Sequence, residues 1–97
     1  MAQRPKNDQW VWVLIQNPGD SEQIVGQHDD DGGISFIPTF LEKEDAQKCY
    51  HFLVREAGKK DEFQAIIFED LLQHAAANGF MIFILNGSGE ILEKIAP

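Results

Sequence analysis

The sequence has few cysteines, few basic side chains and no long hydrophobic run. Cys49 is its one cysteine, so an internal disulfide is excluded and a reducing compartment, the cytoplasm, is expected. The apolar run Trp10–Ile15 is too short for a membrane span or a signal-peptide core, so no membrane partner is expected. With 16 acidic against 8 basic side chains the net charge is −8, which disfavours a nucleic-acid partner.

Length and composition predict a single folded domain. A chain of 97 residues fits one domain, and a hydrophobic content of 43% is typical of globular proteins. The polar residues 1–8 are expected to form a flexible tail, and residues 9–97 the domain itself.

Runs of β-branched and aromatic residues, separated by turn residues, predict strands. The six predicted strands cover residues 10–15, 23–28, 34–40, 63–68, 80–85 and 91–95. Pro38 lacks a backbone N–H, which predicts that its strand lies near a sheet edge or ends at a bulge.

Two amphipathic segments predict helices. From Glu42 to Ala57 the apolar residues recur at spacings of three and four, which places them on one face of a helix. Glu69 and Asp70 open a second helix over residues 71–78, and Gly79 ends it. The element order βββ-α-β-α-ββ predicts an α+β fold: a two-layer sandwich of one mixed sheet of about six strands, with both helices on one face.

Two of the predicted strands, residues 10–15 and 80–85, carry apolar side chains on both faces. Helices on one face would leave the other apolar face exposed, unless terminal segments or long turns cover it, and large exposed apolar patches mark interaction sites. We therefore expect a protein-interaction or self-association module, with Trp10, Trp12 and Phe83 as anchors. The partner is another protein or a second copy, as in a homodimer.

No motif for catalysis or cofactor binding stands out. The Gly-rich segment Asn86–Glu90 lacks the pattern of a phosphate loop or a nucleophile elbow, and Cys49 lies on the apolar stripe of a helix. The sequence therefore predicts no enzyme activity and no cofactor.

An acidic turn supplies the alternative hypothesis. His28 precedes Asp29, Asp30 and Asp31, and carboxylates with an imidazole can bind a divalent ion. The spacing does not fit an EF-hand loop, so His28, Asp29 and Asp31 are weak candidate ligands. On this alternative the chain is a small-molecule or divalent-metal-binding accessory domain.

An ordered set of motifs resembles a known group of proteins. The motifs are an Asn17-Pro18-Gly19 turn, a helix start from Phe40 to Ala46, and the segment from Gln64 to Phe80. They resemble short uncharacterised α+β proteins and are loosely similar to the N-terminal region of SseB-like proteins. The resemblance implies the same order of strands and helices, and it implies no catalytic residues.

Overall fold

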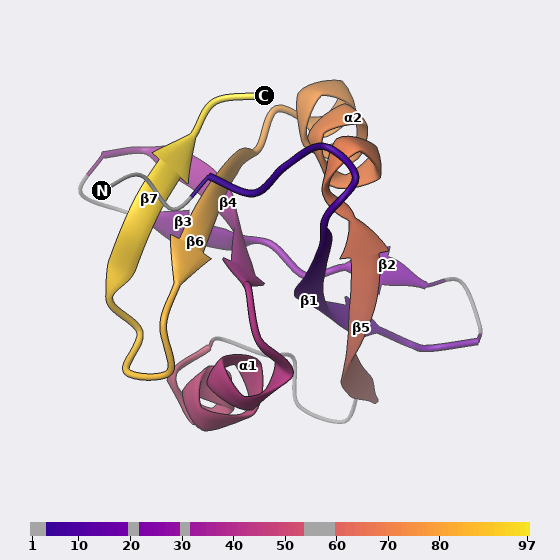
Figure 1. Cartoon of the computed structure of the whole chain (residues 1–97), viewed down its shortest axis with the longest axis vertical. Coiled ribbons are helices and arrows are strands. Elements are labelled where there is room, and N and C mark those ends of the chain that lie inside the picture. Colours follow the sequence, from indigo (N-terminus) through magenta and orange to yellow (C-terminus); the bar gives the residue numbers. More distant parts are fainter. Residues whose placement is uncertain (1–3, 20–21, 30–31, 54–59) are drawn as a thin grey trace.

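The structure is a computed structural model that describes residues 4–19, 22–29, 32–53 and 60–97 (Figure 1). It is an α+β fold with one mixed sheet of seven strands, as the sequence predicts apart from one additional strand. In chain order the elements are β1 (Trp10–Gln16), β2 (Gln23–Ile24), β3 (Gln27–Asp29), β4 (Ile34–Phe40), α1 (Lys43–Cys49), the 3₁₀ turn η1 (Tyr50–Phe52), β5 (Asp61–Ile67), α2 (Phe68–Asn78), β6 (Met81–Leu85) and β7 (Ile91–Ile95).

The strands lie in the order β2-β1-β4-β6-β7, with β5 paired to β1 and β3 paired to β4. The pair β4–β6 is parallel, and every other pair in the described residues is antiparallel. Strand β5 pairs with β1 over all seven of its residues, and β7 pairs with β6. β5 and β7 are therefore the two lateral edges of the sheet.

The second predicted strand is divided in two. β2 pairs with β1, and β3 pairs with β4, so the chain changes partner between Ile24 and Gln27. Gly26 lies at this break, and a Cβ there would come within 2.6 Å of Cε1 of Phe80. The missing side chain allows the aromatic ring to lie against the backbone at the break.

Strand β4 is internal, which corrects the expectation that Pro38 marks a sheet edge or a bulge. On one side β4 pairs with β6 through residues 36–39. On the other side, residues 34–36 pair with β3 and residues 39–40 pair with β1. Pro38 therefore lies where the strand exchanges one partner for another, a position at which a missing N–H is tolerated.

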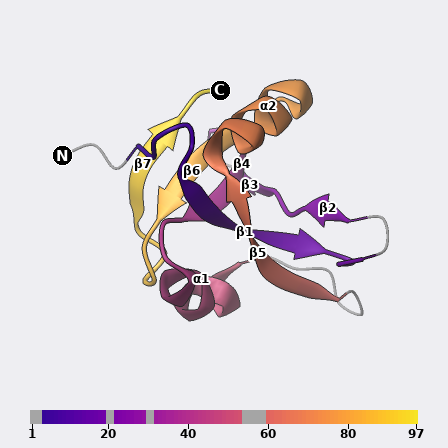
Figure 2. The ribbon, with the colours of Figure 1, turned by 45° about the vertical axis from the view of Figure 1, so that its right-hand side comes forward.

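The two helices lie on opposite faces of the sheet, which corrects the prediction of a two-layer fold (Figures 1 and 2). On one face, Phe68, Leu71 and Ala75 of α2 pack with residues of β1, β4 and β6. On the other, Ala46 and Cys49 of α1 pack with Phe40, Phe83 and Leu85. The second apolar face is thus partly covered by α1, and the fold has three layers.

The strand order explains this placement. Strands β4, β5 and β6 all run in the same direction, because β4 is parallel to β6 and both β4 and β5 are antiparallel to β1. The chain crosses from β4 outward to β5 through α1, and then returns to β6 through α2. Crossovers of the same hand that travel in opposite directions leave their helices on opposite faces.

The first helix is shorter than predicted. It ends at Cys49, continues as η1 and reaches Leu53 in an extended conformation. The Tyr50 hydroxyl donates a hydrogen bond to Asp61, and its ring meets that of Phe63 edge to face. These contacts fix the end of the helix, and residues 54–57 of the predicted helix lie outside the described residues.

The second helix agrees more closely with the sequence. It extends three residues further toward the N-terminus than predicted and stops at Gly79, whose φ of 74° is the left-handed conformation that ends helices. No helix in the described ranges is long and apolar enough to cross a membrane.

The N-terminal segment contacts the domain before residue 9. Pro5 is buried, the guanidinium carbon of Arg4 lies 5.4 Å from the centroid of the Phe68 ring, and the Glu69 amide donates to the Asn7 carbonyl. Of the predicted tail, residues 1–3 lie outside the described residues.

Candidate functional site

Helix α1 leaves one corner of its sheet face open. Trp10 is 58% exposed, although it follows the same face of β1 as Leu14, which is buried. Trp12, between them, is half-buried and packs against the α1-side core. The α1 helix is only seven residues long, so it does not reach the start of β1.

The neighbouring strand extends this apolar corner. Trp10 is opposite Ile67 and Trp12 is opposite Ala65, so all four side chains are on the same face of the β1–β5 pair. Ala65 is exposed and Ile67 is half-buried. We call these four residues, Trp10, Trp12, Ala65 and Ile67, the tryptophan corner.

Lys43 borders the tryptophan corner on the side of α1. The Nζ atom of Lys43, in the first turn of α1, lies 5.4 Å from the centroid of the Trp12 ring. At this distance the ammonium group is attracted to the face of the ring, which holds the indole in place. Trp12 is therefore ordered by the helix, whereas most of Trp10 faces solvent.

The outer edge of β5 lies beside the tryptophan corner. In the described part of the chain, β5 has one ladder partner, β1, over seven residues without a register shift. The strand contains no proline, no lysine and no bulge, three of the devices that protect a sheet edge, and its two charged residues, Asp61 and Glu62, lie at its start. The opposite edge, β7, has both an irregular register near Leu85 and the exposed Lys94.

Carboxylates lie at both ends of this edge. Asp61 and Glu62 begin β5, and the Gln64 side chain donates to Glu62 and to Glu22 at 3.2 Å each. At the other end, Glu69 and Asp70 are exposed in the first turn of α2. The free edge is therefore apolar at its centre and has carboxylates at both ends, beside Lys60 at one end and Arg4 at the other.

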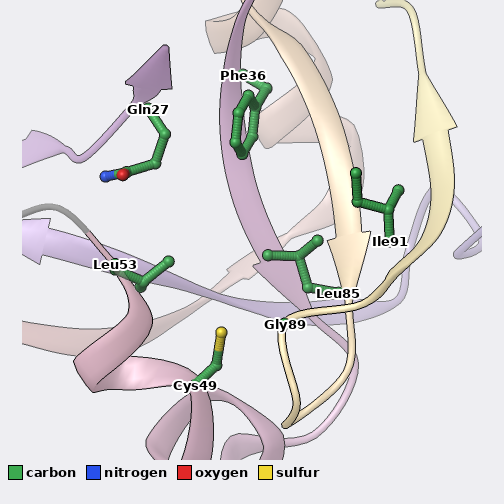
Figure 3. A pocket seen from close by; sticks show the side chains of 7 residues that line it. All are labelled: Gln27, Phe36, Cys49, Leu53, Leu85, Gly89 and Ile91. Atoms are coloured by element: carbon green, nitrogen blue, oxygen red, sulfur yellow. The ribbon is translucent and has the colours of Figure 1, made fainter. Parts of the chain in front are cut away.

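A separate hollow lies between α1 and the sheet (Figure 3). Its volume is about 180 Å³, and it is lined mainly by apolar side chains: Phe36, Leu53, Leu85 and Ile91, with Gln27, Gly89 and Cys49. The Cys49 sulfur points into it from the helix below, and Gln27 lies on the opposite side. The described residues that line this hollow include no carboxylate and no imidazole.

Burial raises the pKa of the Cys49 thiol above its ordinary value of 9.0. The folded state therefore favours the neutral thiol, and the contribution of this group to stability is complete below pH 9.0. As pH rises through the higher pKa of the folded state, that contribution is lost. We expect the unfolding free energy to fall more steeply above pH 9.0 in the natural protein than in Cys49→Ala. Urea titrations at several pH values measure this difference. Equal slopes in the two proteins would contradict a raised pKa of the Cys49 thiol.

The structure describes only part of the acidic turn at residues 28–31. His28 Nδ1 lies 3.3 Å from Ser35 Oγ, and β3 ends at Asp29, while Asp30 and Asp31 lie outside the described residues. Within the described ranges, no three His, Cys, Asp or Glu side chains form a group that could hold a metal ion. The alternative hypothesis of a site at Asp29–Asp31 therefore stays a prediction.

The structure separates the three predicted anchors. Trp10 and Trp12 share the tryptophan corner, but Phe83 is 1% exposed and stacks on Phe36 with ring centroids 4.2 Å apart. Phe83 is therefore a core residue of the folded chain. Sequence reasoning missed Ala65 and Ile67, because their place beside the tryptophans depends on the pairing of β1 with β5.

Comparison with known proteins adds no function to this geometry. The chain matches no family model, no curated protein and no solved structure. The resemblance to short α+β proteins and to SseB-like proteins therefore stays a prediction, and the function is argued from the exposed surface.

Proposed function

We propose that this domain is a non-catalytic protein-interaction module whose contact surface is the tryptophan corner with the free edge of β5. The observation that carries the proposal is the exposure of Trp10, more than half of whose surface is in water. Removing a large aromatic side chain from water contributes on the order of 2 kcal/mol to an association. Tryptophan is also among the residues that most often dominate binding energy in protein interfaces.

The partner is another protein or a second copy of the chain. The tryptophan corner offers a hydrophobic contact, and the edge of β5 offers backbone groups for pairing. Either kind of partner could use these two features. Light scattering over a wide dilution series distinguishes them, since a homodimer has twice the mass of the chain and dissociates on dilution. We also propose a reducing compartment such as the cytoplasm, because the one cysteine is a buried, free thiol.

The test is site-specific photo-crosslinking in cells that express the chain. A photo-reactive aromatic residue replaces Trp10 in one variant, and in the matched control it replaces Leu92, which is 40% exposed on the opposite edge strand. We expect discrete covalent adducts from position 10 and none from position 92. Equal labelling at both positions, or no adduct at position 10, would contradict the proposal.

A further inference from the structure

The free edge of β5 defines the chemistry of the partner. We propose that the partner adds an extended segment to this edge as an additional strand, and that the segment has an apolar centre flanked on both sides by Lys or Arg. The inference rests on the proposed function, because it specifies what the same surface binds.

The backbone of β5 supplies the first part of the argument. An edge strand presents N–H and C=O groups without partners, and an extended peptide pairs with them as a new strand. β5 is seven residues long and regular, so it offers an unbroken template. Strand β7 is a poorer template, because the register irregularity near Leu85 interrupts its ladder.

The side chains of β5 supply the second part. The side chains of Phe63, Ala65 and Ile67 all lie on the face of the tryptophan corner, because they pair with Leu14, Trp12 and Trp10 on β1. Ala65 is exposed and short, so it does not screen the half-buried Trp12 behind it. A large apolar side chain on the added strand, placed opposite Ala65, would extend over it toward the indole rings. The edge therefore selects an apolar residue at the centre of the segment.

The charges at the two ends of β5 supply the third part. Asp61 and Glu62 lie at one end of β5, directly after Lys60, and the Gln64 side chain donates to Glu62 and to Glu22. Glu69 and Asp70 follow the other end, where the guanidinium of Arg4 also lies over the Phe68 ring. A strand that runs along the whole edge, in either direction, meets carboxylates at both of its ends. Basic flanking residues complement both ends, and acidic ones are repelled.

The same charges disfavour a second copy on this edge. A symmetric dimer pairs β5 with its own copy in antiparallel orientation, so residue 61 of one chain lies near residue 67 of the other. This arrangement brings the acidic start of each β5 toward Glu69 and Asp70 of the other copy. Each chain also carries a net charge of −8, which adds repulsion over a longer range. A basic segment of a different protein meets no such penalty.

The experiment uses the full chain and two synthetic peptides of about nine residues, long enough to span an edge strand. Both have a centre of alternating apolar residues and threonine, with lysine pairs at the ends of one and glutamate pairs at the ends of the other. Binding is followed by amide chemical shifts and by hydrogen exchange. We expect the lysine peptide to shift and protect amides of residues 61–67, and to bind at least about tenfold more tightly than the glutamate peptide.

Two variants with the same change of charge locate the binding. Ala65→Lys places an ammonium group on the edge itself, and Ala76→Lys places it at an exposed position on α2. We expect Ala65→Lys to weaken binding of the lysine peptide by about tenfold or more, and Ala76→Lys to leave it within about twofold. Raising the salt concentration should weaken binding in the natural protein, since the flanking contacts are exposed.

The outcomes separate the inference from the function on which it rests. Equal binding of both peptides, protection at β7 in place of β5, or equal effects of the two variants would overturn the strand-addition proposal. A dimer whose protected amides lie in β5 would also overturn it, because a second copy would then occupy the edge. If crosslinks form at position 10 while the peptides fail to bind, the interaction module stands without strand addition. If crosslinks are also absent, both proposals fail.

Discussion

Replacing Phe83 by alanine is expected to lower the free energy of unfolding by about 3–5 kcal/mol. The side chain is almost fully buried on the α1 face of β6, where it stacks on Phe36 and packs with Phe40 and Leu85. Truncation removes the apolar area of the ring from the core and leaves a cavity that the surrounding strands cannot fully close. A loss of this size is a large part of the total stability of a small domain, which is about 5–15 kcal/mol.

Urea denaturation followed by tryptophan fluorescence measures this loss, because Trp10 and Trp12 are the two tryptophans and both lie on β1 of the same sheet. Leu92→Ala is the matched control, since it also removes apolar atoms but from an exposed position on β7. We expect the control to change the unfolding free energy by less than about 1 kcal/mol. If Phe83→Ala instead leaves stability unchanged and reduces association, Phe83 is an interface anchor and not a core residue.

Replacing Ala46 by glutamate is expected to detach α1 from the sheet at a cost of several kcal/mol, about the size expected for an unpaired charge in an apolar core. Ala46 is fully buried against Phe40 and Phe83. A glutamate at this position must either bury its carboxylate among aromatic rings or displace the helix. Because α1 has only seven residues, it has little stability of its own and displacement is the expected result.

The thiol of Cys49 reports this detachment directly. Cys49 lies on the same side of α1, three residues after Ala46, and is buried in the folded state. We expect a thiol-specific reagent to modify Ala46→Glu rapidly and to modify the natural protein only as slowly as it opens. Gln47→Glu is the control, because it adds the same carboxylate one residue later at an exposed position. Slow modification of both variants would show that α1 stays docked.

Local sequence patterns predicted the elements well and their arrangement poorly. The strand positions and the end of α2 at Gly79 depend on neighbouring residues, so turn chemistry and periodicity were sufficient. The faces occupied by the helices depend on the order of strands in space. The sequence does not show that order, because α1 connects β4 to β5 at one edge of the sheet and α2 then connects β5 back to β6 in its interior.

The apolar pattern of β1 and β6 held more information than the two-layer prediction used. Apolar side chains on both faces are typical of strands that are covered on both sides. The structure covers them with one helix on each face, and among the described residues of β1 the corner around Trp10 remains open. Trp10 and Trp12 could be selected from the sequence as exposed candidates, but nothing local distinguished them from Phe83, which occupies the same face closer to α1.

The pairing of β1 with β5 also has a consequence for synthesis of the chain. Trp10 is opposite Ile67, so β1 leaves the ribosome more than fifty residues before its full-length neighbour exists. Until β5 has been synthesised, β1 carries apolar side chains on both faces and lacks its seven-residue pairing with β5. Pairings this distant in sequence slow folding and prolong the exposure of apolar segments. The interval between residues 16 and 61 is therefore the period in which the nascent chain most needs protection from aggregation.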